Sequence, residues 1–332
     1  SQRVLAGTAS LRQGDDGMRF SADVGGPIAA IIPARFRSFF GADTRLKTAG
    51  TVKTGGGLRL DTLTLDSAAL ALRASLETAA DNFLQRLDLH ASIDDPQQEK
   101  TLLPIAGADA TVEQATVDLS FGEAASENWT GSVRVTDLST PTFGSKLVDV
   151  KLGGLAQNLN DAANRVVTFS AKGGATGIVA TDAAVAEALG DRIDLDVDGS
   201  WKAAQPIELA RAAVAANGFN LGLAGTIADL VFNGTISVDA ANIAPFSQMA
   251  GRDLTGELHL AAKGSVSPLS GGFDLDLDGT GSGLTVAIPA ADNLLQGTTR
   301  LSGGVSRGEK GLAARKFRIA NDQAALTADG TY

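Results

Sequence analysis

Apolar and polar residues alternate with a period of two along most of this chain. Clear examples lie at residues 63–65, 117–121, 148–152, 193–197 and 273–277. Because successive side chains of a strand point to opposite faces, each segment has one apolar face and one polar face. The pattern therefore predicts antiparallel strands in a sheet whose polar face is solvated.

Four short apolar segments each end at a glycine that precedes a strand. They are residues 36–41, 185–190, 246–251 and 293–297, and the strands are expected to begin near Leu46, Ile193, Leu254 and Leu301. We expect short helices here, with Thr181 and Asp182 placed to cap the second and Gly190 to end it. A second glycine follows in each copy, at Gly50, Gly199, Gly264 and Gly304.

A degenerate repeat of this kind is typical of a chain that grows by adding units along one axis. Residues 28–78, 178–226 and 285–332 fit the repeat unit best, and no shift in composition marks a domain boundary. We therefore expect residues 1–332 to form one elongated, all-β repeat segment. The chain begins and ends in mid-pattern, so we also expect it to be a fragment of a longer protein.

Composition and charge narrow the range of partners. The net charge is −10 and no run of basic residues occurs, which argues against a nucleic-acid partner that needs Lys and Arg to neutralise phosphates. There is no cysteine, so disulfides and thiolate metal sites are excluded. The longest wholly apolar run, residues 28–32, is far shorter than the ~20 residues of a membrane-spanning helix.

Two segments match the opening of a calcium loop, with aspartates at alternate positions before a glycine. They are residues 194–199 and 274–279. A complete loop has a bidentate Glu at its twelfth position, where this chain has Gln205 and Thr285. The residues between the aspartates are apolar, so we interpret both segments as strands with a solvated acidic face and expect no metal.

Residues 304–308 match the G-x-S-x-G pattern of a hydrolase nucleophile. That triad requires a histidine after the serine, but the two histidines, His90 and His259, both precede Ser306. Ser306 is expected in a glycine-rich turn, and His259 on the polar side of a strand. With two histidines and no thiol there is little material for catalysis, so an enzyme is the least expected class and no cofactor is expected.

The remaining feature is the set of apolar strand faces, which permits two interpretations. One is a closed hydrophobic core, as in a β-sandwich or β-helix; the other is an open sheet folded into a U-shaped trough with an apolar lining. Small residues at many alternate positions leave room for the second, although packing arguments alone do not separate the two. The residues expected to line such a groove are Leu60, Leu65, Leu72, Leu195, Val197, Leu221, Leu223, Leu258, Leu260, Leu275 and Leu277.

Residues 264–275, 301–304, 318–321 and 326–330 together resemble the TamB family of the wider AsmA-like group. The likeness covers most of the chain, is strongest from about residue 178 onward, and rests on repeat texture more than on an invariant site. It implies a trough-like β-sheet in the periplasm, attached to the inner membrane through an N-terminal segment absent from this sequence. It also implies phospholipid movement between the two membranes and assembly of outer-membrane proteins with the barrel protein TamA. The contact with TamA is expected in regions absent from this sequence.

The resemblance and the strand pattern agree on a non-enzymatic segment that conducts phospholipid acyl chains. Moving a sixteen-carbon chain through water costs roughly 12 kcal/mol at about 0.8 kcal/mol per methylene, and an apolar lining removes most of that cost. Two alternatives remain. One is a chaperone surface that pairs with nascent outer-membrane strands by β-augmentation, and the other is a passive solenoid with a closed core.

Overall fold

The computed structural model describes residues 5–28, 31–105, 109–122, 127–308 and 311–331. Over these residues the fold is all-β, with 66% strand and 9% helix, and the 21 described strands form an antiparallel sheet that is not closed into a barrel. The predicted fold class is confirmed. The chain divides into two compact units, Ser1–Gly177 and Ile178–Tyr332, and the boundary falls within strand β12 (Val166–Ala180).

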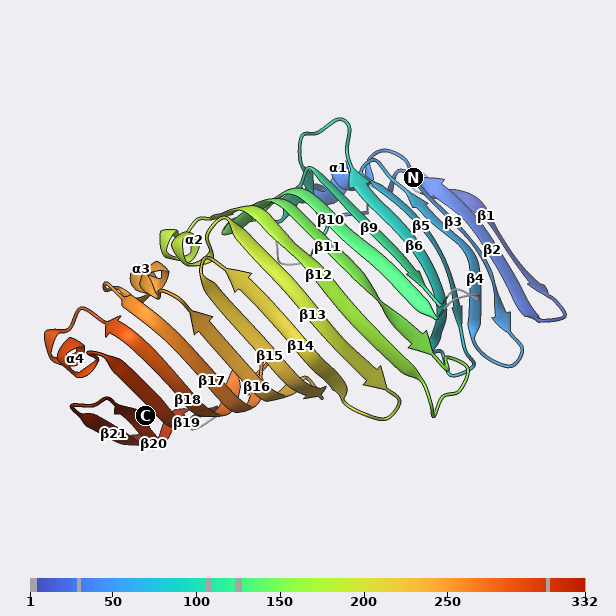
Figure 1. Ribbon diagram of the computed structural model, residues 1–332. Helices are drawn as coiled ribbons and strands as arrows, with labels where there is room; N and C mark the ends of the chain where they lie inside the picture. Colours follow the sequence, from blue (N-terminus) through green and yellow to red (C-terminus); the bar gives the residue numbers. More distant parts are fainter. Residues whose placement is uncertain (1–4, 29–30, 106–108, 123–126, 309–310, 332) are drawn as a thin grey trace. The chain divides into compact units, whose positions relative to one another are not determined.

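In the first unit, the strands pair in the order β1–β2–β3–β4–β5–β6–β9–β10–β11, with β8 beside β10 and β7 beside β8 (Figure 1). Their bounds are β1 Ala6–Gln13, β2 Gly17–Gly26, β3 Thr44–Lys53, β4 Leu58–Asp66, β5 Leu70–Thr78, β6 Leu84–Asp94, β7 Thr101–Leu102, β8 Thr111–Val112, β9 Gln114–Phe121, β10 Asn128–Ser139 and β11 Phe143–Gln157.

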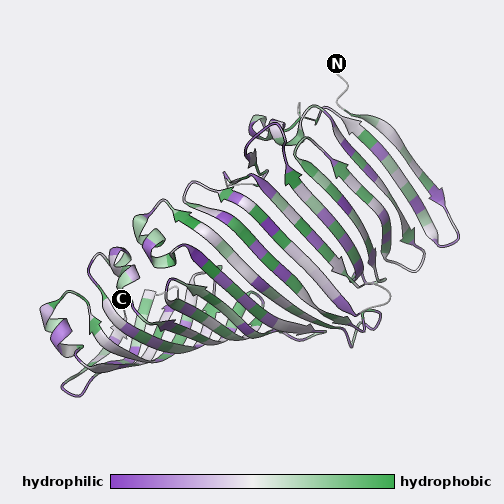
Figure 2. Cartoon of the chain, turned by 45° about the horizontal axis from the view of Figure 1, so that its top comes forward, coloured by the Kyte–Doolittle hydropathy of each residue, from purple (hydrophilic) through white to green (hydrophobic). Residues whose placement is uncertain are grey.

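In the second unit, β13 to β21 pair strictly in chain order. Within this unit the sheet is curved rather than flat (Figures 1 and 2). The bounds are β13 Arg192–Lys202, β14 Ile207–Ala216, β15 Phe219–Ala228, β16 Val231–Ala240, β17 Thr255–Ser267, β18 Gly272–Thr285, β19 Thr298–Gly308, β20 Gly311–Ala320 and β21 Ala325–Thr331.

Short helices occur beside all four predicted segments, although the fourth begins and ends earlier than the predicted residues 293–297 and overlaps them only at Asn293 and Leu294. They are α1 Arg37–Phe40, preceded by the 3₁₀ turn η2 Ala34–Phe36; α2 Ala183–Leu189; α3 Ser247–Ala250, preceded by η3 Ala244–Phe246; and α4 Pro289–Leu294. The glycine that follows each one has a positive φ, between 66° and 76°, at Gly41, Gly190, Gly251 and Gly297. A positive φ, which glycine adopts without steric cost, turns the chain from the helix into the next strand and explains why the repeat ends in glycine.

The second glycine of each copy marks an irregularity in three cases out of four. The strand register shifts beside Gly50, Gly199 and Gly304, whereas Gly264 lies in a regular ladder. Such bulges increase local twist. The prediction for Ser306 was wrong: it lies within β19, not in a turn, so a nucleophile elbow with its strand–turn–helix geometry does not form.

Candidate functional site

In the first unit, Leu60, Leu65 and Leu72 lie on one face of the sheet, although Leu60 and Leu65 are an odd number of residues apart. In a regular strand this spacing would put them on opposite faces. A bulge between Leu60 and Leu63 brings both to the same face, so that Leu60 pairs with Leu76 and Leu65 pairs with Leu72. Pairing then carries the face across further strands, because Cα partners in a ladder point the same way. One row reads Leu65, Leu72, Ala91, Val117, Val133 and Val150 across β4, β5, β6, β9, β10 and β11.

The eight predicted residues of the second unit also share one face. The central row crosses all nine strands as Leu195, Val214, Leu221, Val238, Leu260, Gly279, Leu301, Ile319 and Leu326. A parallel row contains Val197, Leu223 and Leu277, and Leu258 and Leu275 flank these rows. Figure 2 shows the alternation along each strand as bands of green and purple. We call this surface, in each unit, the apolar face.

The side chains on the apolar face are only partly buried. Of the eleven predicted residues, Leu60 is buried at 9% exposure and the other ten are half-buried. Leu11, which pairs with Phe20 on the same face, is 66% exposed, and Leu326 at the end of the central row is 61% exposed. The buried apolar residues of the described chain are few, and most of them are alanines. This exposure favours an open apolar face over a sealed core.

Two aromatic residues mark one end of the apolar face in the first unit. Phe121 is the last residue of β9 and Trp129 the second of β10, and their ring centroids lie 6.4 Å apart. The Trp129 indole N–H donates to the backbone carbonyl of Thr168 at 2.9 Å. The ring passes over Gly154 of β11, where an added Cβ would lie 2.7 Å from the indole nitrogen. No sequence pattern predicted this aromatic pair.

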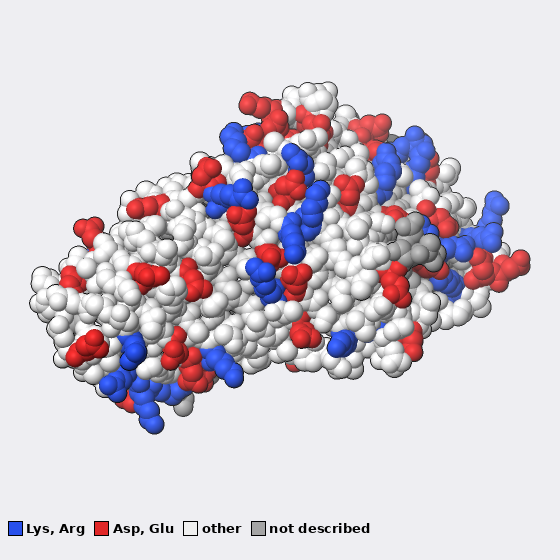
Figure 3. Space-filling view, viewed as in Figure 1, with Lys and Arg blue, Asp and Glu red and all other residues white. Residues whose placement is uncertain are grey.

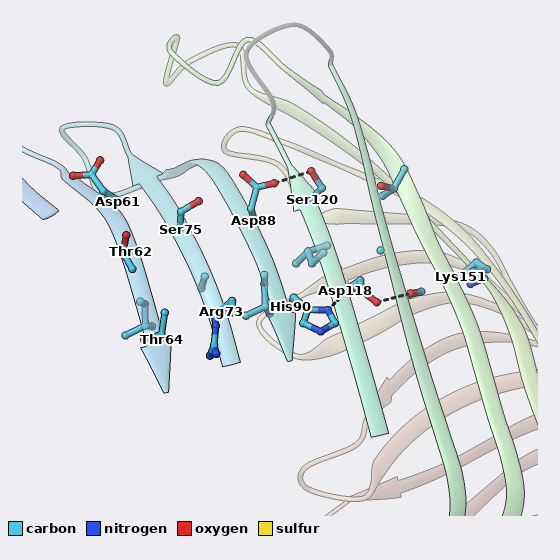
Figure 4. A pocket seen from close by; sticks show the side chains of 17 residues that line it. Asp61, Thr62, Thr64, Arg73, Ser75, Asp88, His90, Asp118, Ser120 and Lys151 are labelled. Carbon is cyan, nitrogen blue, oxygen red and sulfur yellow. Dashed lines mark hydrogen bonds and ion pairs between the residues drawn. The ribbon is translucent and has the colours of Figure 1, made fainter. Parts of the chain in front are cut away.

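The opposite, polar face carries ladders of hydroxyl and charged side chains. In the first unit, Thr64, Arg73, His90, Asp118, Ser132 and Lys151 are successive Cα partners across six strands. They line a shallow hollow of about 650 Å³ (Figure 4). His90 Nδ1 and Asp118 Oδ1 are 2.6 Å apart, and the Ser120 hydroxyl donates to Asp88 at 3.0 Å. A hollow lined by Arg73, His90 and Ser132 was not foreseen.

Charged residues of both signs are interspersed over the surface in Figure 3. Many form ion pairs between strands on the polar face, including Arg134 with Asp149 at 2.7 Å and Arg315 with Asp274 at 2.6 Å. Both aspartate series of the calcium-like motifs lie there: Asp194 is bound by Arg192, Asp196 by Arg211 and Asp276 by Arg315. Within the described residues, no group of three or more His, Cys, Asp or Glu side chains is arranged to hold a metal ion.

His259 lies on the polar face of β17, as predicted. Its Nδ1 is 2.7 Å from Asp239 and its Nε2 is 2.8 Å from Glu257. Because both ring nitrogens donate only in the imidazolium form, this geometry favours the charged ring. The hydrogen bond to Asp239, followed by that to Glu257, raises the pKa of His259. With Ser306 inside β19, the arrangement ties strands together and forms no catalytic triad.

No family model, curated protein or solved structure matches this chain. None of the helices in the described part of the chain is long and apolar enough to cross a membrane. The described sheet thus has two faces of opposite character, of which the apolar one remains accessible.

Proposed function

We propose that this protein is a non-enzymatic conduit for phospholipid acyl chains. The observation that carries the proposal is the partly exposed apolar face, whose rows consist mainly of Leu, Val and Ile. At ~4.8 Å between strands, the nine-strand row of the second unit follows a contour of ~38 Å. An acyl chain in one leaflet occupies about 15 Å, half of a 30 Å hydrocarbon core, so the row is long enough to hold one chain throughout a transfer step.

The wider setting belongs to the same proposal. The strand repeat resembles TamB-like proteins, so the chain would form part of a periplasmic bridge between the inner and outer membranes. Its anchor in the inner membrane and its contact with the barrel protein TamA would lie in regions outside this sequence. The polar face, with interspersed acidic, basic and hydroxyl side chains, would keep the sheet soluble between the membranes.

A photo-crosslinking amino acid at Leu195 or Leu277 tests the proposal. These positions lie on the apolar face, and the adjacent residues Asp196 and Asp276 serve as matched controls because alternation turns them to the polar face. We expect phospholipid to be captured in cells from Leu195 and Leu277 and not from the controls. Capture from the aspartate positions alone would contradict a lipid path on the apolar face.

A second candidate function is a chaperone for outer-membrane strands. The observation that favours it is the exposure of β1 and β21, whose residues are all exposed and which each pair, within the described chain, with one neighbour only. Free backbone N–H and C=O groups on such edges are templates for β-augmentation. Crosslinks from β1 or β21 to unfolded barrel protein, with none to lipid from Leu195 or Leu277, would favour this function over conduction.

A further inference from the structure

A buried arginine joins two distant connections of the first unit. The Arg165 side chain is only 7% exposed. Its guanidinium donates through Nη1 to Asp81 Oδ2 at 2.6 Å and through Nη2 to Asp81 Oδ1 at 3.0 Å. Nε donates to the Leu159 carbonyl at 2.9 Å, and the group lies 4.2 Å above the centroid of the Phe83 ring. A bidentate, stacked arginine of this kind is geometrically specific.

We call Arg165, Asp81 and Phe83 the latch. Asp81 and Phe83 lie in the turn between β5 and β6, and Arg165 ends the loop between β11 and β12. Strands β9 and β10 lie between β6 and β11 in the sheet. The latch therefore reaches past the ends of β9 and β10, and a hydrogen bond from Gln85 to Asn160 supports the same contact.

The latch holds the start of β12, the strand whose backbone accepts the hydrogen bond of the Trp129 indole. Thr168 lies three residues after Arg165, and its carbonyl accepts the Trp129 indole N–H. The same residue contacts β11 through its side chain, because Leu155 N donates to Thr168 Oγ1 at 2.8 Å. These side-chain bonds supplement the pairing of β11 with β12 near the end of the strand, where local opening costs least.

From this geometry we infer that Trp129 is a gate for acyl chains at one end of the apolar face, and that the Arg165–Asp81 latch holds the gate across β11. The inference rests on the proposed function. The row Leu60, Leu76, Leu87 and Phe121 ends beside the Trp129 ring. Release of the latch frees the start of β12, removes the Thr168 carbonyl from the indole and opens the end of the row. Arg165 acts on Trp129 through Thr168 and is a positioning residue.

Fluorescence of Trp129 tests the inference directly. A Trp201→Phe background leaves Trp129 as the sole tryptophan, because the chain contains two. Vesicles of dibrominated phosphatidylcholine are the probe, since bromine quenches indole at contact. We expect Arg165→Gln to raise the acrylamide quenching constant of Trp129 about twofold by local opening. It should also increase quenching by the brominated vesicles.

Two matched variants separate the latch from a general loss of structure. Arg134→Gln removes another arginine–aspartate pair of the same unit, at 2.7 Å, and should leave Trp129 quenching unchanged. Asp81→Asn removes the charge of the other partner of the pair and should raise Trp129 quenching as Arg165→Gln does. Combined with Arg165→Gln it should add little further change, because both substitutions break the same contact.

The outcomes distinguish this inference from the function on which it rests. Equal quenching by brominated lipid with the latch intact and broken overturns the gate and leaves lipid conduction standing. No quenching in either state, together with no lipid capture at Leu195 or Leu277, overturns conduction itself. An identical change in Trp201, followed in a Trp129→Phe background, would also overturn the gate, because it would show general unfolding.

Discussion

At the scale of single residues, glycine lets long side chains cross a strand. Trp129 passes over Gly154 on the apolar face, and Arg315 passes over Gly304 on the polar face to reach Asp276 two strands away. An added Cβ at Gly304 would lie 2.7 Å from the Arg315 guanidinium. Glycine within a strand is usually unfavourable. Here the missing side chain makes room for Trp129 and Arg315, which explains both glycines.

His259 supports a prediction of pH dependence at this scale. Hydrogen bonds to Asp239 and Glu257 raise its pKa above the ordinary value. A group whose pKa rises on folding stabilises the fold fully below its unfolded pKa, about 6.5, and that contribution is lost as the pH rises through the folded pKa. Relative to His259→Gln, amides of β16 and β17 should thus exchange more slowly at low pH, with the difference disappearing at higher pH.

The check is amide hydrogen exchange together with NMR titration of the His259 ring. Glu257→Gln is the control, because it removes one of the two negative charges beside the ring and should lower the pKa of His259 toward the ordinary value. A difference between wild type and His259→Gln that stays constant across the pH range would contradict the charged, doubly bonded ring.

At the scale of elements, the helix–glycine–strand copies were predictable because their signals are local. Asp182 caps α2 by accepting from Ala184 N at 2.8 Å and Val185 N at 3.3 Å, and Gly190 follows the helix with φ 68°. The latch was not predictable, since Asp81 and Arg165 are 84 residues apart and no local pattern joins them. The face on which Leu60 lies depends on a bulge that the residue pattern does not reveal. The glycines around Ser306 indicated a turn, but strand β19 continues through them.

The cap of α2 gives a prediction for this element. Asp182→Ala removes the acceptor for two helix N–H groups and should destabilise α2 by about 1 kcal/mol. Faster hydrogen exchange is expected at the amides of residues 186–189 and, because α2 contacts η3 and α3, at those of residues 247–250. Asp182→Asn keeps an acceptor and should behave like wild type; equally fast exchange in both variants would refute the role of the cap.

At the scale of the whole molecule, the separation of an apolar face from a polar face is the property on which the proposed function depends. Leu277→Asp places a carboxylate between Ala262 and Gly303 on the apolar face. Losing one buried leucine contact costs roughly 1.5–3 kcal/mol, so acyl-chain binding should weaken about tenfold or more. Lipid transfer between donor and acceptor vesicles measures this effect.

The matched control is Thr280→Asp, which adds the same charge to the polar face of the same strand. It should transfer lipid at the wild-type rate, and both variants should keep the β-rich circular dichroism spectrum. If the two variants lose transfer equally, net charge and not the apolar lining decides the rate.

In the second unit, the helices follow strands β12, β16 and β18, all even-numbered, and so they lie at the same end of the strands. Antiparallel order makes a hairpin the smallest piece that can be inserted or deleted without moving a helix to the opposite end. Related sequences should therefore differ in length by whole hairpins. An alignment of related sequences would test this. Its insertions and deletions should comprise strands in pairs, together with the connections that join them.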